Sequence, residues 1–205
     1  NNYDTANSNW FSIHNPITEK MLMTGEGIPE EMSDDDVYYK KSDTTSQTKR
    51  LRDFHNLYVK SKIIGSVSNS DDTLIDVAVG KGGDLPKWTK SKLDFVFGID
   101  YSKDNIENKL DGACARYLNE KKKRYRLPYC LFVHGNSSMN IRNTDAINSD
   151  KYKTITRAVF GDGPKDETII GKGVFKHYGK GKNGFNITSC QFALHYFFEN
   201  ITILQ

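Results

Sequence analysis

Cysteine is scarce in this sequence: Cys114, Cys130 and Cys190 are the only three among 205 residues, and each lies in an apolar run. An odd number of widely spaced cysteines argues against a disulfide framework and predicts buried thiols in a reducing compartment. No pair of cysteines or histidines has the spacing of a zinc site. No apolar run approaches the roughly 18 residues of a membrane span, and no signal peptide is visible. These absences predict a soluble cytoplasmic protein that binds neither metal nor membrane.

Net charge is also small, +3 at pH 7, but the charges are distributed unevenly along the chain. Residues 121–126 contain five basic side chains, and residues 34–36 are three consecutive aspartates. Such a basic block either binds phosphate or forms the solvated end of a helix, and the sequence leaves both interpretations open. The length and the hydrophobic content of 37% predict one ordinary domain with an extension.

A glycine-rich stretch has the pattern of a nucleotide-cofactor site. The apolar run at residues 74–79 predicts a buried parallel strand, and Gly80, followed by two more glycines, predicts a turn that opens a helix. Glycines let the backbone approach a ligand closely, and the start of a helix directs amide groups toward it. A second predicted strand, residues 95–99, ends in Asp100, about 20 residues beyond the glycines. This architecture places there the acid that binds ribose hydroxyls.

Two features have competing interpretations. Asp76, inside the first predicted strand, is either an unpaired core residue or an anchor for the amides of the glycine loop, and we favour the second. Residues 109–112, Lys-Leu-Asp-Gly, match the pattern of covalent nucleotidyltransferases, in which the lysine attacks a nucleoside triphosphate. A position in the middle of a predicted helix, without companion motifs nearby, favours coincidence for this match.

Apolar spacing and turn residues predict the other elements of the first half. Residues 1–42 show no period and are interpreted as an irregular arm or an interdomain linker. A helix predicted over residues 46–64, stopped by Gly65, places Asn56 and Lys60 on one face. After the second strand, Ser102 caps a predicted helix whose buried stripe is Ile106, Leu110, Ala113, Cys114 and Tyr117, with Arg116 beside it.

The second half begins with a third predicted strand at residues 129–133. A long insertion follows at residues 138–184, with one helix predicted over residues 149–161 and the remainder predicted as a functional or mobile loop. Residues 185–190 predict a fourth strand. Strands that alternate with helices predict a parallel α/β sheet with ligands at the carboxyl ends of its strands.

Two segments resemble signature segments of a known family. Residues 79–88 read Val-Gly-Lys-Gly-Gly-Asp-Leu-Pro-Lys-Trp, and residues 189–196 read Ser-Cys-Gln-Phe-Ala-Leu-His-Tyr. Over roughly residues 46–200 the chain resembles the mRNA cap (guanine-N7) methyltransferases. The insertion and residues 10–16 are most similar to the multifunctional capping enzymes of large cytoplasmic DNA viruses. The resemblance implies an α/β fold of the Rossmann-like class I S-adenosylmethionine-dependent methyltransferases.

The resemblance also implies an activity, which is methyl transfer from S-adenosylmethionine to N7 of the terminal guanine of capped mRNA. It implies capped RNA as the substrate and guanylyltransferase and triphosphatase domains on the same polypeptide. It further implies a cytoplasmic location at a viral replication site, or in the virion. Two alternatives stay open: a methyltransferase of another RNA or small-molecule class, and a non-catalytic methyltransferase-fold scaffold that binds capping-enzyme partners.

The implied site residues position ligands, and none is a catalytic acid or base. Ala78 stands where the family usually has glycine, and Asn136 stands where an acidic residue is common, so its amide oxygen is expected to read adenine N6. The implied cofactor-binding residues are Asn56, Lys60, Asp76, Ala78, Gly80, Asp100, Tyr101, Asn136, Ser137 and Gln191; the cap-guanine residues are His195 and Tyr196; the cap-phosphate residues are Lys87 and Arg116.

The resemblance covers only part of the family's domain. Members of the family have three further strands and an acidic residue that clamps the guanine, whereas this sequence ends at Gln205. We therefore expect residues 43–205 to be the N-terminal part of a methyltransferase domain, in a fragment of a longer polypeptide that lacks the C-terminal strands. These 205 residues alone are expected to bind cofactor weakly and to transfer methyl poorly or not at all, because one wall of the guanine pocket is missing.

Overall fold

The computed structural model describes residues 49–123 and 126–198. The chain divides into two compact units, Asn1–His55 and Asn56–Gln205. Within the first unit the structure describes one α-helix, and the arm or linker predicted for residues 1–42 lies outside the described residues. The predicted site residues all belong to the second unit, so the fold of that unit determines their arrangement.

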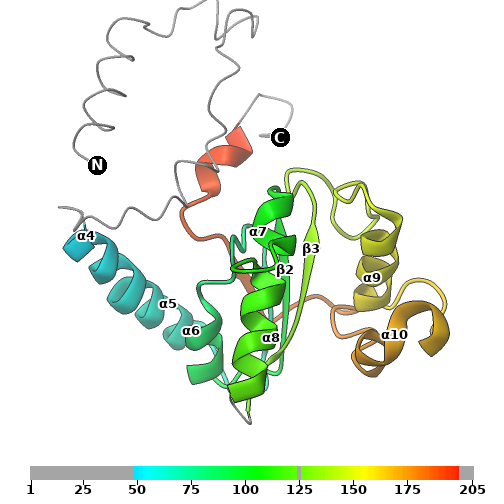
Figure 1. The fold of residues 1–205 in the computed structure, drawn as a ribbon, viewed down its shortest axis with the longest axis horizontal. Coiled ribbons are helices and arrows are strands. Elements are labelled where there is room, and N and C mark those ends of the chain that lie inside the picture. Colours follow the sequence, from blue (N-terminus) through cyan, green and yellow to red (C-terminus); the bar gives the residue numbers. More distant parts are fainter. Residues whose placement is uncertain (1–48, 124–125, 199–205) are drawn as a thin grey trace, which may run out of the picture. The chain divides into compact units, whose positions relative to one another are not determined.

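A four-stranded parallel sheet forms the centre of the second unit, in the order β3-β2-β1-β4. Figure 1 labels its strands β2 and β3. The chain builds outward from β1 through β2 to β3 and then returns to add β4 on the other side of β1. The predicted parallel α/β fold is confirmed, and the strand order reverses between β1 and β4, which is where such sheets bind ligands. The strands are β1 (Thr73–Asp76), β2 (Phe95–Asp100), β3 (Tyr129–His134) and β4 (Ile187–Ser189).

Helices cover both faces of the sheet, because side chains along each strand alternate between two apolar clusters. None of the helices in the described part of the chain is long and apolar enough to span a membrane. The helices are α4 (Lys49–Asp53), the π-helix η1 (Phe54–Val59), α5 (Lys60–Val67), α6 (Leu85–Lys90), α7 (Lys103–Glu107), α8 (Ala113–Lys123), α9 (Asp150–Phe160), α10 (Glu167–Lys176) and the 3-10 helix η2 (Leu194–Phe198).

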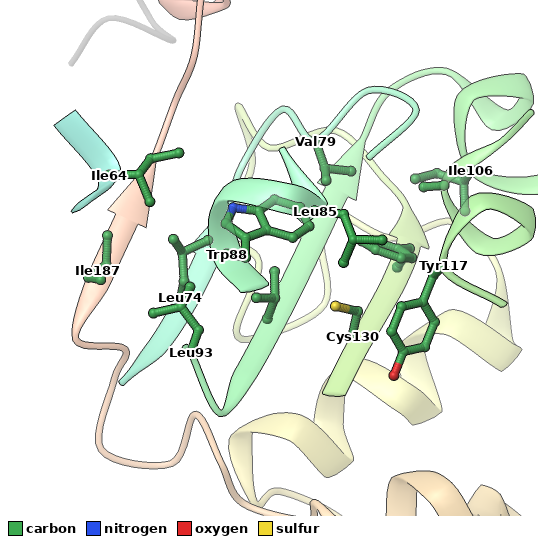
Figure 2. Close-up of a cluster of buried hydrophobic side chains, with 13 residues drawn as sticks. Ile64, Leu74, Val79, Leu85, Trp88, Leu93, Ile106, Tyr117, Cys130 and Ile187 are labelled. Carbon is green, nitrogen blue, oxygen red and sulfur yellow. The ribbon is translucent and has the colours of Figure 1, made fainter. Parts of the chain in front are cut away.

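The face covered by α5, α6 and α8 holds a core built around Trp88. Trp88 and Leu85 of α6 point onto the strands, with Ile64 of α5 on one side and Tyr117 of α8 on the other (Figure 2). The side chain of Trp88 has no exposed surface. Burial of a large aromatic side chain is among the strongest contributions to packing, so this contact fixes α6 and the loop before it on the sheet.

The opposite face, covered by α9, holds an aromatic cluster. Phe185 stacks on Phe95 and Phe97 of β2, with ring centroids 6.4 and 6.3 Å apart. Phe160, the last residue of α9, meets Phe185 edge to face at 5.9 Å. The predicted helix is confirmed, and it ends where Gly161 adopts a left-handed conformation with φ of 75°, as in common helix C-terminal caps.

The single long helix predicted after Ser102 is wrong, although Ser102 does cap α7 by accepting the amide of Asn105. The chain leaves the helix at Asn108, whose side-chain oxygen accepts the amides of Leu110 at 2.9 Å and Asp111 at 3.3 Å. Such side-chain bonds to the backbone compete with helix formation. Leu110, predicted in the buried stripe, is therefore 86% exposed, and residues 109–112 lie in a turn between α7 and α8.

The loop predicted for the second half of the insertion is also wrong, because it contains α10. The side chain of Asp166 accepts the amide of Thr168 at 2.8 Å and begins this helix. Ile170 and Val174 pack with α9 in a small apolar cluster. Gly171 leaves helical geometry with φ of 78°, so α10 consists of two short helical stretches joined by a kink at this glycine.

The first predicted helix ends later in the sequence and is less buried than its pattern indicates. It continues beyond Gly65 to the end of α5 and includes the π-helical stretch η1. Leu57 and Tyr58, which helped to define its apolar spacing, are 66% and 57% exposed, and Ile64 is the residue that enters the core. The spacing predicted the helix, but it did not identify the side that packs.

The prediction of three buried thiols is confirmed for one cysteine only. Cys130 of β3 is buried, and burial raises the pKa of its thiol. Cys114 and Cys190 are half-buried, and all three are free thiols. The two half-buried cysteines lie at the start of α8 and just after β4, where the apolar runs end at the edge of the core.

Candidate functional site

The glycine loop between β1 and α6 lies across the carboxyl end of β2. The amide of Val79 donates to the carbonyl of Ile99 at 2.9 Å, and the amide of Gly80 donates to Oδ2 of Asp100 at 2.6 Å. A Cβ atom at Gly98 would lie 2.8 Å from the side chain of Val79, so a glycine in the strand leaves room for the loop. Gly80 has φ of 54°, a conformation that glycine adopts at little cost.

Asp100, at the end of β2, is the centre of a hydrogen-bond network. Its Oδ2 accepts the Gly80 amide, and its Oδ1 accepts the amide of Ser102 at 3.0 Å and the side-chain amide of Asn105 at 2.9 Å. A carboxylate offers about four acceptor positions. These three bonds therefore leave room for one more donor, such as a hydroxyl group of a ligand.

Four polar side chains form a charged cluster beside the start of α6. Lys60 Nζ lies 3.2 Å from Oδ2 of Asp84, and Lys87 Nζ lies 2.8 Å from its Oδ1. Lys87 also donates to Oδ1 of Asn56 at 2.9 Å. The side chains of Asp84 and Lys87 are 9% and 7% exposed, so these charges are largely shielded from solvent screening. Asn56 and Lys60 were predicted on one helix face. Asn56 thus contacts Lys87 directly and Lys60 shares Asp84 with it, although Lys87 was assigned to the cap phosphates.

Asp76 is a buried carboxyl group at the end of β1. It is 2% exposed, and its Oδ1 accepts the amide of Ala78 at 3.1 Å. Burial raises the pKa of Asp76 to about 7; the hydrogen bond from Ala78 opposes this rise, and the negative charge of Asp84 adds to it. The interpretation of Asp76 as an anchor for the loop is confirmed for the Ala78 amide.

Asn136 and Ser137 follow β3 in a tight turn against the insertion. The amide of Asn136 donates to the carbonyl of Ala146 at 2.7 Å, and its side-chain oxygen accepts the amide of Ser138 at 3.0 Å. The hydroxyl of Ser137 is buried and makes no hydrogen bond to any described residue. A buried hydroxyl without a partner is costly, which makes Ser137 a candidate for contact with a bound ligand.

The segment after β4 carries the second set of predicted residues. Gln191 is half-buried, and Phe192 has φ of 60°, an unusual backbone conformation for a bulky residue. The Phe192 ring lies over Lys60, with the amine 5.3 Å from its centroid. In η2 the rings of His195 and Tyr196 lie 4.0 Å apart at 42°. This segment therefore reaches the charged cluster through Phe192 and presents two further rings nearby in the sequence.

The remaining predicted residues differ widely in exposure. Tyr101 is 75% exposed directly after Asp100. Arg116 is half-buried in the first turn of α8, where its amide donates to the carbonyl of Gly112. Lys87 is buried in the charged cluster. Lys87 and Arg116, both expected to contact the cap phosphates, therefore have very different surroundings.

Two charged residues of the site were absent from the sequence-based assignment. Asp84 pairs with both lysines of the charged cluster. Its position in the first signature segment, directly between the glycines and α6, is the sequence feature that could have identified it. Lys81 is 7% exposed inside the glycine loop and pairs with carboxylates of α7 and of the turn after it. No local pattern in the sequence indicates that pairing.

Features elsewhere do not compete with this site. A small hollow at the amino-terminal ends of the strands is lined in part by Asp71, Lys92, Asp94 and Arg126. Two positive and two negative charges balance there, and none of the predicted site residues lines the hollow. Among residues 49–123 and 126–198, no three or more histidine, cysteine or acidic side chains are grouped so that they could hold a metal ion.

Comparison with known proteins gives consistent results. The chain is 28% identical to a probable mRNA-capping enzyme of Acanthamoeba polyphaga mimivirus, over 98% of this chain and 17% of that protein. It is 26% identical to mRNA cap guanine-N(7) methyltransferase 1 of Oryza sativa subsp. japonica, over 69% of this chain and 29% of that protein. A Schizosaccharomyces pombe mRNA cap guanine-N(7) methyltransferase is 30% identical over 47% of this chain and 24% of its own length.

The first two matches cover most of the chain and the third covers about half of it, and the chain spans less than a third of the length of each of these relatives. The family model for the mRNA (guanine-N(7))-methyltransferase domain matches residues 31–203, a range that contains both signature segments and every predicted site residue. With the parallel sheet and the glycine loop after β1, this match establishes that the chain belongs to the mRNA (guanine-N(7))-methyltransferase domain family.

Proposed function

We propose that this chain transfers a methyl group from S-adenosylmethionine to N7 of the terminal guanine of capped mRNA. The observation that carries the proposal is the position of the two signature segments. One follows β1 and the other follows β4, and the strand order reverses between these two neighbours. Segments on the two sides of such a reversal line one crevice, so a cofactor and a guanine bound by them would meet there.

The residues after β1, β2 and β3 fit the groups of S-adenosylmethionine. Gly80 brings backbone close to the site without a side chain, and Asp100 retains one acceptor position for a ribose hydroxyl. Ser137 offers a buried hydroxyl that has no partner among the described residues, beside Asn136, the residue proposed for adenine. The Asn136 oxygen already accepts one amide, which leaves its second lone pair for the adenine amino group.

The charged cluster suits the methionine end of the cofactor, which carries both an ammonium and a carboxylate. Lys60 and Asp84 are opposite charges 3.2 Å apart, and each can exchange part of its contact with the other for a contact with the ligand. Lys87 and Asn56 then keep Asp84 in place from the other side. In this proposal Lys60 binds the carboxylate and Asp84 the ammonium. Asp76 is a buried carboxyl group whose protonation responds to the charges of Asp84 and Lys60, and hence to a ligand bound by them.

The chemistry requires positioning and no general base. S-adenosylmethionine supplies a methyl group that is already activated for transfer, and guanine N7 has a free lone pair at neutral pH. The chain must align the two within about 3 to 3.5 Å and exclude water. We assign His195 and Tyr196 to the guanine ring, Gln191 to the boundary between the two ligands, and Arg116 to the cap triphosphate.

Partners and location follow from the same proposal. Capped RNA is the substrate, and guanylyltransferase and triphosphatase domains on the same polypeptide would supply it. The similarity to a probable mRNA-capping enzyme of a virus supports this assignment of partners; the match covers 17% of that viral protein. We therefore also propose action at a cytoplasmic viral replication site or in the virion.

The test uses the 205-residue chain with labelled S-adenosylmethionine and two RNAs of one sequence, one ending in GpppN and one in an uncapped triphosphate. We expect label on the capped RNA only, at low turnover, and at N7 of the terminal guanine after nuclease digestion. Calorimetry with S-adenosylhomocysteine provides an independent measure of cofactor binding.

The same measurements separate the alternatives. Cofactor binding with label transferred to another position, or to another class of acceptor, would favour a methyltransferase of a different specificity. A chain that binds neither S-adenosylmethionine nor its product would favour the non-catalytic scaffold. The Asp100→Ala variant serves as the matched control, because it removes the central carboxylate of the cofactor site.

A further inference from the structure

The four residues Lys109, Leu110, Asp111 and Gly112 resemble a nucleotidyltransferase motif, but the structure gives most of them a different role. They form the turn between α7 and α8. The amide of Gly112 donates to the carbonyl of Asn108 at 3.0 Å, and a Cβ atom at Gly112 would lie 2.7 Å from the Asn108 backbone. The turn itself therefore requires the glycine, and the glycine gives no support to a covalent role for Lys109.

Asp111 reaches back from this turn to the glycine loop. Nζ of Lys81 lies 3.0 and 3.1 Å from the two oxygens of Asp111 and 3.3 Å from Oδ2 of Asp104. The side chain of Lys81 is 8% exposed, whereas that of Asp111 is 35% exposed. Burial alone would lower the pKa of Lys81, but the bonds to Asp111 and Asp104 outweigh it and raise that pKa, so the amine stays charged.

The glycine loop needs such an anchor because of its composition. Gly80, Gly82 and Gly83 give it more backbone freedom than any other residues would, and ordering that backbone costs entropy. Two contacts hold it to β2, from the amides of Val79 and Gly80. The Lys81 pair adds a charged contact that ties the middle of the loop to the turn between α7 and α8, beside the close approach of Gly82 to Ala113.

We propose that Asp111 is a positioning residue that, through Lys81, holds the glycine loop in the conformation that receives the cofactor. This inference rests on the proposed use of S-adenosylmethionine at that loop. A loop ordered before binding spares the ligand the cost of ordering it, which improves affinity. Loss of Asp111 therefore weakens cofactor binding without removing any group that touches the reacting atoms.

The test compares the full 205-residue chain with the variants Asp111→Ala and Lys109→Ala, two changes in the same turn. Hydrogen exchange of the peptide that covers residues 80–83 is measured without ligand. Affinity for S-adenosylhomocysteine and methyl transfer at saturating cofactor are measured separately. For Asp111→Ala we expect exchange at least tenfold faster, affinity at least tenfold weaker, and kcat within about twofold of the parent once cofactor saturates. Lys109→Ala should match the parent in all three.

Each other outcome has a defined meaning. Unchanged loop exchange in Asp111→Ala overturns the proposal, as does a covalent guanylate adduct that forms on the parent and disappears in Lys109→Ala. If the parent binds no S-adenosylmethionine, the proposed function fails while the exchange result still tests the anchor.

A second variant covers the case in which Asp111→Ala unfolds because it leaves Lys81 buried without its main partner. The double change Lys81→Met with Asp111→Leu removes both charges together, so no charged side chain is left buried at position 81. The proposal expects this variant to fold and still to show fast exchange in residues 80–83. A folded double variant with the slow exchange of the parent overturns it.

Discussion

The two signature segments of this chain differ sharply in how the fold holds them. In residues 79–88 the charged side chains of Lys81, Asp84 and Lys87 are at most 9% exposed and are paired. In residues 189–196 the rings of Phe192 and Tyr196 are 55% and 57% exposed. The fold holds the first segment through paired, buried charges, and the second presents exposed aromatic side chains.

Position in the sheet explains the difference. The first segment follows β1, which has a paired strand on each side and helices above it. The second follows β4, the strand at the end of the sheet within the described residues. A centrally held segment is ordered by the fold, whereas an edge segment gains its order from whatever covers it, which includes a ligand. Changes in the first segment should therefore affect folding and binding together, and changes in the second should affect binding alone.

The largest effect is expected for Asp100→Ala. This change removes the acceptor for three hydrogen bonds, each of which involves a charged group and is worth about 1.5 to 3 kcal/mol. We expect no detectable S-adenosylhomocysteine binding by calorimetry and a clearly lower midpoint of thermal unfolding. Asp162→Ala, which removes a carboxylate that is 52% exposed beyond the end of α9, is the control for the loss of a negative charge. Unchanged affinity in Asp100→Ala would remove this residue from the site.

The second prediction concerns the edge segment. Tyr196→Ala should reduce methyl transfer to capped RNA roughly 10- to 100-fold, because stacking of a base on one aromatic ring contributes about 1 to 3 kcal/mol. Cofactor affinity and thermal stability should stay near the parent values, since the ring is more than half exposed. Leu194→Ala, a neighbour that is 60% exposed, is the matched control. If Tyr196→Ala loses cofactor binding, its assignment to guanine is wrong.

The third prediction is a pH dependence at Asp76, the last residue of β1, just before the first signature segment. Burial raises the pKa of Asp76 from its ordinary value of 3.8 to about 7, so the fold favours the protonated form. Asp76 therefore contributes stability below pH 4 that is lost progressively as the pH rises to 7, at up to about 1.4 kcal/mol per unit.

Asp76→Asn should remove this slope, because asparagine keeps the acceptor for the Ala78 amide but does not titrate. The measurement is the difference in free energy of unfolding by urea between parent and variant at pH 5 and pH 7.5. This difference cancels the opposite contributions of other carboxylates, such as Asp104, whose pKa a hydrogen bond from Asn108 lowers. Equal differences at the two pH values would contradict the raised pKa.

The smallest effect is expected for Arg116→Ala, which should weaken binding of capped RNA a few-fold. The slope of log affinity against log salt concentration should become shallower by about one, the value for one lost phosphate contact. Lys87→Met provides the contrast within the comparison, because Lys87 lies in the buried cluster with Asp84 and Asn56. We expect Lys87→Met to lower thermal stability more than Arg116→Ala does. Salt slopes identical to the parent for Arg116→Ala would assign that residue to the solvated surface.

The sequence by itself determined the elements that depend on local pattern. The apolar run before Gly80, the glycines, and the acid at the end of the next strand predicted a strand, a turn and a helix start, and these are confirmed. Alternation of strands with helices likewise predicted the parallel sheet. Such predictions succeed because backbone preferences and side-chain periodicity act over a few neighbouring residues. The two signature segments were sufficient to identify the family for the same reason, since each is read as a continuous string.

Only the tertiary structure decided how the charges of the site are paired. Lys60 meets Asp84 across 24 positions of sequence, Asn56 meets Lys87 across 31, and Lys81 meets Asp111 across 30. These contacts depend on how α5 packs beside α6, and on where the turn after α7 lies above the glycine loop. The exposed side chain of Leu110 and the helix α10 escaped prediction for the related reason that a side-chain hydrogen bond or a distant apolar contact outweighed local propensity. Packing between distant segments sets such pairings, and no short window of sequence records it.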